Sequence, residues 1–340
     1  MNNDVNEFDL RVISDIERQN ARKDFSRIGF GFLLFSGIAL LVSLIIQIAV
    51  YSFSEEIYNS HLFRNIVTPV SMYLFALPVL IALLRGVKPV PPEKKRVKFA
   101  AFMAYLAVGF GFMYIGAFAG NGVMSLLSNV TGNDYSNALE SVVDGNLWIT
   151  AIFVVVIAPI GEELVFRKLL IDRTGKYGGF ISALLSGVIF GLMHGNFYQF
   201  FYATLLGFLL AYVYSSTGKI GYCIAIHAII NFSGSIVSTL LNNALGDFLN
   251  ATEMTNEQML DFIAEKWPWF ILMIVFNLLV YASIACAVIL PLAFKRKIKF
   301  VKGCTQLTKG EISVAAFFNA GVTCMIIFYV AEFLLSLLPS

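Results

Sequence analysis

The stretch LWITAIFVVVIAPIGEELVFRKLL, residues 147–170, decides the fold. A helix needs about 20 mainly apolar residues to cross about 30 Å of hydrocarbon, and this stretch is long enough. Towards its carboxyl end it also carries Glu162, Glu163 and Arg167. Charged side chains inside a membrane span are costly and are retained chiefly for function. The stretch therefore predicts a transmembrane helix that also carries part of a functional site.

The composition of the whole chain is typical of a membrane protein. Of its 340 residues, 58% are hydrophobic and only 14% are charged, and the mean hydropathy is +0.76. A soluble domain cannot bury that much apolar surface and keep a wettable exterior. The net charge of +2 comes with no basic stripe and no binding motif for nucleic acid. We therefore expect the lipid bilayer as a partner and no nucleic acid.

Nine segments are apolar enough to be candidate spans. They predict an all-α fold, a polytopic transmembrane helical bundle of about nine spans with a polar cavity inside the membrane. The fifth segment is short and barely separated from the sixth, so these two could instead form a re-entrant pair. The segments are Ile28–Phe53, Ile66–Leu84, Phe99–Gly120, Leu147–Leu170, Phe180–His194, Phe197–Tyr214, Ile220–Leu241, Trp269–Phe294 and Ile312–Leu338.

The charges of the connections alternate along the chain. Basic residues gather in residues 1–27, 85–98 and 295–302, whereas acidic residues gather in 55–56, 134–144 and 247–265. Basic segments stay on the cytoplasmic side of a membrane. The alternation predicts a multi-pass protein of the cell membrane, with a cytoplasmic amino terminus and an external carboxy terminus.

The charged residues of the fourth segment face different directions. Glu163 and Arg167 are four residues apart, so they share one helix face and can neutralise each other. Such a pair alone is more often structural than catalytic. Glu162 points about 100° away from Glu163 and is left without this partner. An unpaired carboxylate inside a span needs a functional explanation.

Further polar residues lie on two other predicted spans. His194 follows Phe190 by four residues, and Asn231 follows His227 by the same spacing, so each pair shares a helix face. A G-x-x-x-G-x-x-x-G ridge at 187–195 would let another helix approach closely beside the first histidine. Each feature alone has an ordinary structural explanation. Two carboxylates, two imidazoles and an amide on neighbouring spans are together costly and favour a functional site.

This set of residues has the chemistry to hydrolyse a peptide bond. Glu162 and His194 could hold and deprotonate water, while His227 and Asn231 could donate hydrogen bonds to the oxyanion. No cofactor is certain. Zinc is the one candidate, held by Glu162, His194 and His227 with a fourth position for water. The chain lacks the H-E-x-x-H pattern of common zinc proteases, and we favour metal-free glutamate chemistry.

The predicted depths of these residues disagree in one respect. Counted from the predicted cytoplasmic ends, Glu162 and His227 lie about 10 Å deep but His194 lies about 20 Å deep, at a rise of 1.5 Å per residue. Either the fifth span starts later than Phe180, or the fourth and seventh spans reach further into the membrane.

Three motifs together give the chain a family likeness. G-E-E-x-x-x-R at Gly161–Arg167, F-x-x-x-H at Phe190–His194 and H-x-x-x-N at His227–Asn231 resemble the CAAX protease and bacteriocin-processing (CPBP, or Abi) family of intramembrane endopeptidases. The likeness covers about Leu147–Leu241. It implies a helical core with a polar cavity open to the cytoplasmic side. It implies the same water-activating pair and oxyanion donors as the chemical argument, with three supporting motif residues: Glu163, Arg167 and Phe190.

These features divide the chain into five segments. Residues 1–27 are a cytoplasmic amino-terminal segment, 28–146 are accessory transmembrane helices, and 147–241 are the CPBP-type catalytic core. Residues 242–267 are an external acidic loop, and 268–340 are accessory carboxy-terminal helices. Within the acidic loop, Thr255 followed by Gln258 is typical of a capping box and predicts a short external helix.

The sequence thus predicts a CAAX-type intramembrane endopeptidase that acts on a peptide or a membrane protein. A prenylated C-terminus and a bacteriocin-type peptide are both open as substrates. Two other functions stay open. A proton- or ion-coupled transporter would also use intramembrane Glu, His and Arg, although no inverted repeat supports it. A non-catalytic scaffold or immunity protein is the other, because the family includes members linked to self-protection.

Overall fold

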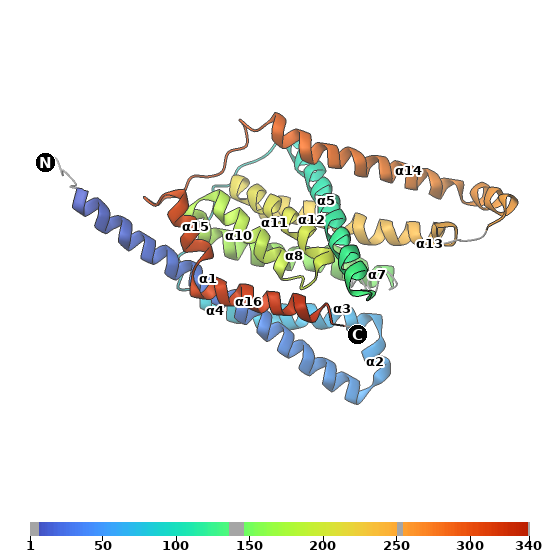
Figure 1. Ribbon diagram of the computed structural model, residues 1–340, viewed down its shortest axis with the longest axis horizontal. Coiled ribbons are helices and arrows are strands. Elements are labelled where there is room, and N and C mark those ends of the chain that lie inside the picture. Colours follow the sequence, from blue (N-terminus) through green and yellow to red (C-terminus); the bar gives the residue numbers. More distant parts are fainter. Residues whose placement is uncertain (1–6, 136–145, 250–253, 339–340) are drawn as a thin grey trace.

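The computed structural model describes residues 7–135, 146–249 and 254–338. Figure 1 shows a bundle of helices, and no strand occurs in these residues. The prediction of an all-α polytopic bundle is confirmed. Seven segments are long and apolar enough to cross a membrane, and the bent pair α15 (Lys309–Phe317) and α16 (Ala320–Leu335), which meet at 55°, would be an eighth.

All nine predicted segments are helical over most of their length, but the ninth is interrupted at Phe318 and Asn319 and the fifth is short. α10 (Gly179–Leu192) has 14 residues, which rise about 21 Å and so fall short of about 30 Å of hydrocarbon. The seven long spans are Ser14–Phe53 in α1 (Glu7–Phe53); His61–Leu84, made of α3 (His61–Pro69), η1 (Val70–Ala76) and α4 (Leu77–Leu84); α5 (Phe99–Thr131); Leu147–Tyr177; α11 (Phe197–Thr217); Ile220–Leu249, made of α12 (Ile220–Asn231), η5 (Phe232–Val237) and α13 (Ser238–Leu249); and α14 (Asn256–Ala293).

The span Leu147–Tyr177 changes its type of helix several times along its length. It consists of α7 (Leu147–Thr150), η2 (Ala151–Ile157), α8 (Ala158–Glu163), η3 (Leu164–Leu169), α9 (Leu170–Thr174) and η4 (Gly175–Tyr177). The η2 and η3 segments are π-helical. Pro159 has no N–H for the α-helical ladder, and the wide winding of η2 ends just before it. π segments are frequent at functional sites, and α8 between them carries both glutamates.

The connections gather at two opposite ends of the bundle (Figure 1). The basic connections after α4 and after α14 lie at the left of the view, on the same side as the start of α1. The corner at α2 (Glu55–Asn59) and the facing ends of α13 and α14 lie at the right, and they carry acidic residues. This arrangement agrees with the alternation of charge in the sequence. The orientation in a membrane stays a prediction.

Two glycines let α10 pack directly on α11. A Cβ atom added at Gly187 would lie 2.7 Å from the carbonyl oxygen of Thr204, and one at Gly191 would lie 2.8 Å from that of Phe200. Both helices therefore approach at backbone distance, as the glycine ridge predicts. The third glycine of the ridge takes another role. Gly195 has a φ of 65°, a left-handed conformation that favours glycine, and lies in the turn between the two helices.

A row of buried aromatic rings connects α1 to the middle of the bundle. The rings of Phe32 and Phe166 have centroids 5.5 Å apart, and those of Phe166 and Phe190 are 5.0 Å apart. All three side chains are buried. Their positions fix α10 against η3, so the row positions two of the three motif-bearing segments.

The acidic segment 242–267 is not a loop over most of its described residues. α13 continues to Leu249, and α14 begins at Asn256. The predicted capping box is present, since Thr255 Oγ1 accepts from the backbone of Gln258 and the Gln258 side chain accepts in return. The helix that it starts is not short, because the apolar sequence beyond it continues the helix to Ala293. Residues 250–253 lie outside the described part. The amino-terminal segment is likewise helical from Glu7 and continues directly into the first span.

Candidate active site

Three segments of the chain bring the predicted site residues together. α8 and η3 carry the G-E-E-x-x-x-R motif, α10 leads to His194, and α12 carries the H-x-x-x-N motif. Gly178 forms the corner between the span Leu147–Tyr177 and α10, with a φ of 125°. Glu162 lies as many residues before this corner as His194 lies after it, so the two have similar depths in the helical hairpin. The fourth span reaches further than predicted, which removes the expected difference in depth between these two residues.

Arg167, Glu163 and His227 form one buried chain of contacts. Nη2 of Arg167 donates to Oε1 of Glu163 at 3.1 Å, and Nδ1 of His227 lies 2.9 Å from the same oxygen. The side chains of the ion pair are 0% exposed. An ionised carboxylate only accepts hydrogen bonds, so Nδ1 of His227 carries the proton. The predicted Glu163–Arg167 pair therefore also orients an imidazole.

The second contact of the ion pair is close but poorly aligned. Nε of Arg167 lies 2.9 Å from Oε2 of Glu163, yet neither atom has a hydrogen-bond partner among the described residues. Nη1 of Arg167 donates to the hydroxyl of Ser186 at 3.2 Å, and that hydroxyl donates to the carbonyl of Phe166 at 3.0 Å. Ser186 thus ties the guanidinium to α10.

Glu162 is the accessible carboxylate of the cluster. Its Oε2 lies 3.7 Å from Nε2 of His227, which is too long for a direct hydrogen bond. Its side chain is 21% exposed, in contrast to the fully buried Glu163. Of the two adjacent glutamates, only Glu162 therefore combines access with a position beside an imidazole.

The two ring nitrogens of His194 have different roles, because only one of them contacts the backbone. Nδ1 lies 2.8 Å from the carbonyl oxygen of Phe190, and a carbonyl can only accept. Nδ1 therefore carries a proton, and in the neutral ring Nε2 is an acceptor. This is the form of the imidazole that can accept a proton or a hydrogen bond from water.

The ring of Phe190 lies against three groups of the cluster, namely the two imidazoles and the guanidinium of Arg167. Its ring centroid lies 5.1 Å from that of His194 and 5.8 Å from that of His227, both edge-on. The guanidinium carbon of Arg167 lies 5.0 Å from the same centroid. Phe190 therefore holds the two imidazoles at fixed angles and also covers the buried cation.

Asn231 lies one helical turn beyond His227. Its Nδ2 donates to the carbonyl oxygen of Val154 at 2.9 Å, in the π-helical segment η2. A π-helical segment leaves carbonyls that can accept from side chains, and this contact joins α12 to the span that carries the glutamates. The amide has a second N–H, which is still available as a donor.

Sequence reasoning missed three residues around this cluster. Ser186 fixes Arg167, as described above. The ring of Tyr202 lies 6.4 Å from that of His194, and its hydroxyl accepts from Gln199 Nε2 at 2.8 Å. Tyr73, in η1, packs against the backbone of Gly161, where any Cβ would overlap the tyrosine ring. The one sequence signal for Tyr73 is that the motif begins with glycine, which permits such a close approach.

We expect Gly161→Ala to destabilise the protein by about 1–3 kcal/mol, because the added methyl group must displace the ring of Tyr73. Thermal unfolding of the purified protein in detergent would measure the loss. The double variant Gly161→Ala/Tyr73→Leu should recover most of it, since leucine leaves room for the methyl group. Equal losses in the single and the double variant would show that the contact with Tyr73 is not the cause.

The metal alternative does not fit the arrangement of the side chains. Among the described residues, no group of three His, Cys, Asp or Glu side chains is placed to hold a metal ion. This includes the set Glu162, His194 and His227 that the sequence offered for zinc. We therefore derive no step through a metal.

Part of this chain matches a known protein family. Residues 144–233 match the family described as type II CAAX prenyl endopeptidase Rce1-like. The match contains all three motifs and all seven residues of the predicted site. No curated protein and no solved structure gives a significant match.

Proposed function

We propose that this chain, whose residues 144–233 match the Rce1-like family of type II CAAX prenyl endopeptidases, is an intramembrane endopeptidase with Glu162 as its general base. The observation that carries this proposal is that two adjacent glutamates differ in burial and in their contacts. Glu163 is buried and committed to Arg167 and His227, while Glu162 is accessible beside the same imidazole. A structural ion pair would account for Glu163 alone.

In the proposed reaction Glu162 and His194 share the attacking water. The carboxylate of Glu162 takes one proton, and Nε2 of His194 accepts a hydrogen bond that orients the oxygen lone pair. The resulting hydroxide attacks the peptide carbonyl carbon. The proton on Glu162 then passes to the leaving nitrogen as the C–N bond breaks, which gives a carboxylic acid and an amine and restores the carboxylate.

His227 and Asn231 are the proposed donors to the oxyanion. Asn231 donates through the N–H that does not contact Val154. Nδ1 of His227 already donates to Glu163, so its Nε2 must carry a second proton to act as a donor. Glu163 and Arg167 serve as positioning residues, because they hold the His227 ring through that contact. Donors fixed in this way stabilise developing charge without having to reorient.

The proposed setting is the cell membrane, with the amino terminus cytoplasmic and the carboxy terminus external. The basic end of the bundle would then face the cytoplasm. The multi-pass architecture and the family both favour a peptide or membrane-protein substrate reached from the bilayer. A prenylated C-terminus and a bacteriocin-type peptide are the two substrate classes that we propose to test first.

The test is N-terminal peptide profiling of membranes from cells that carry the native protein or Glu162→Ala at matched levels. New termini with the native protein alone are the expected result, and they would also identify substrates. Identical profiles from the native protein and the Glu162→Ala variant, with both folded, would contradict the proposed endopeptidase activity. Substrate-dependent proton flux in liposomes would then favour a transporter, and an unchanged biological phenotype would favour a scaffold or immunity protein.

A further inference from the structure

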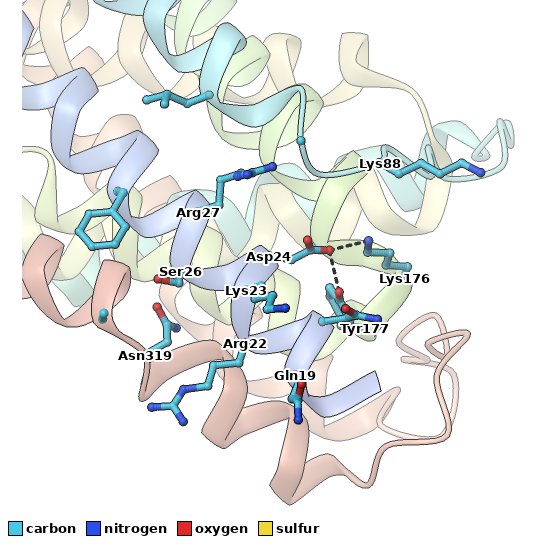
Figure 2. A pocket seen from close by; sticks show the side chains of 15 residues that line it. Gln19, Arg22, Lys23, Asp24, Ser26, Arg27, Lys88, Lys176, Tyr177 and Asn319 are labelled. Carbon is cyan, nitrogen blue, oxygen red and sulfur yellow. Dashed lines mark hydrogen bonds and ion pairs between the residues drawn. The ribbon is translucent and has the colours of Figure 1, made fainter. Parts of the chain in front are cut away.

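A basic cavity of about 970 Å³ lies where α1 meets three other parts of the chain at one end of the bundle. Figure 2 shows it from close by, with side chains from α1, from the end of α4 and the segment after it, from the corner after α9, and from the junction of α15 and α16. Four segments far apart in the sequence thus form one hollow. Its charged lining residues are Arg22, Lys23, Asp24, Arg27, Lys88 and Lys176.

The positive charges of this cavity are largely uncompensated. Its one acid, Asp24, accepts from Nζ of Lys176 and from the hydroxyl of Tyr177, each at 2.7 Å, as the dashed lines in Figure 2 mark. In the part of the chain that the structure describes, no ion pair involves Lys23, Arg27 or Lys88. Several unpaired cations around one cavity favour an anionic ligand.

One of these cations is held in place by backbone packing. The guanidinium of Arg27 lies against Gly86, so closely that a Cβ at Gly86 would overlap it. The glycine therefore leaves the space that Arg27 occupies at the edge of the cavity. A planar guanidinium is well suited to two parallel hydrogen bonds with a phosphate, and the neighbouring lysines add point charges.

The cavity also has an apolar side that continues onto the surface of the bundle. Phe30, Leu83 and Ala320 contribute apolar side chains to its lining. Phe30 is 40% exposed, and Leu34, one turn further along α1, is 45% exposed. A ligand with a charged head and a hydrocarbon tail would match both sides at once.

We propose that this cavity binds a phosphate group, and specifically the headgroup of an anionic phospholipid, with the acyl chain along the apolar face of α1. Basic pockets between transmembrane helices are known to suit such headgroups. Tyr177 ends the span that carries Glu162, so this site lies at the end of that span, away from the catalytic cluster. It is independent of the proposed protease activity.

The test is native mass spectrometry of the full-length protein in detergent, titrated with phosphatidylglycerol or phosphatidylcholine. We expect selective retention of phosphatidylglycerol. The variant Lys23→Gln/Arg27→Gln/Lys88→Gln should bind it roughly a hundredfold more weakly, at roughly fivefold per cation. The matched control Lys295→Gln/Arg296→Gln/Lys297→Gln removes the same charge from another basic connection and should bind like the native protein.

Two further arms make the result decisive. Arg27→Gln alone should weaken binding by roughly fivefold and leaves the other basic residues that guide insertion in place. Inorganic phosphate, added as a competitor, should not displace the lipid at millimolar concentration; displacement would identify soluble phosphate as the ligand and overturn the lipid assignment. Equal binding of phosphatidylcholine, or equal losses in the cavity and control variants, would overturn the site itself.

Discussion

Glu162→Gln is expected to lower the rate of peptide cleavage by about 10²–10⁴-fold, the usual contribution of a positioned general base. The amide has nearly the same shape as the carboxylate but cannot take a proton from water. Glu162 is not part of the buried ion pair, so the substitution should leave the fold intact. The rate would be measured with the purified protein on a substrate identified by the profiling experiment.

The matched control for this variant is Glu332→Gln. Glu332 lies on α16, in a predicted span, and lines a different cavity with Ser36 and Tyr329. It tests whether any carboxylate removed from the membrane-spanning part slows the enzyme. Comparable losses in both variants, or cleavage at the native rate with Glu162→Gln, would remove Glu162 from the role of general base.

The sequence predicted the parts of this structure that depend on local spacing. Apolar length identified the helices, and the Thr255–Gln258 capping box identified the start of α14. The spacing of four residues predicted that Glu163 and Arg167 would pair, which they do. Each of these features is decided within one or two turns of helix, where side-chain geometry follows directly from residue number.

The contacts between helices could not be predicted in the same way. The link from Glu163 to His227 joins residues 64 positions apart, and the position of Phe190 between two imidazoles depends on how α10 settles against η3. Tyr73 lies outside the family match altogether. Long-range packing of this kind leaves only indirect marks in a single sequence, such as the glycine at position 161 that Tyr73 requires. The loop that was predicted over 242–267 is largely helical, because acidic side chains do not by themselves end a helix. α13 continues to Leu249, and the capping box at Thr255 starts α14.

Arg167→Met is expected to destabilise the protein by about 3–5 kcal/mol, because it removes the guanidinium that pairs with the buried carboxylate of Glu163. Removing both charges together should cost much less, since a neutral pair of similar volume avoids the desolvation of two ions. The double variant Glu163→Gln/Arg167→Met should therefore unfold at a higher temperature than the single variant. Thermal unfolding in detergent measures both.

A second double variant separates stability from orientation of the imidazole. Glu163→Leu/Arg167→Met also removes both charges, but it leaves Nδ1 of His227 without an acceptor. It should be about 1–3 kcal/mol less stable than the Gln/Met pair, the cost of one unsatisfied buried donor. It should also cleave more slowly than the Gln/Met pair, because only glutamine can still hold the His227 ring. Equal cleavage by the two double variants would show that Glu163 acts only as the partner of Arg167, and that His227 finds its position without it.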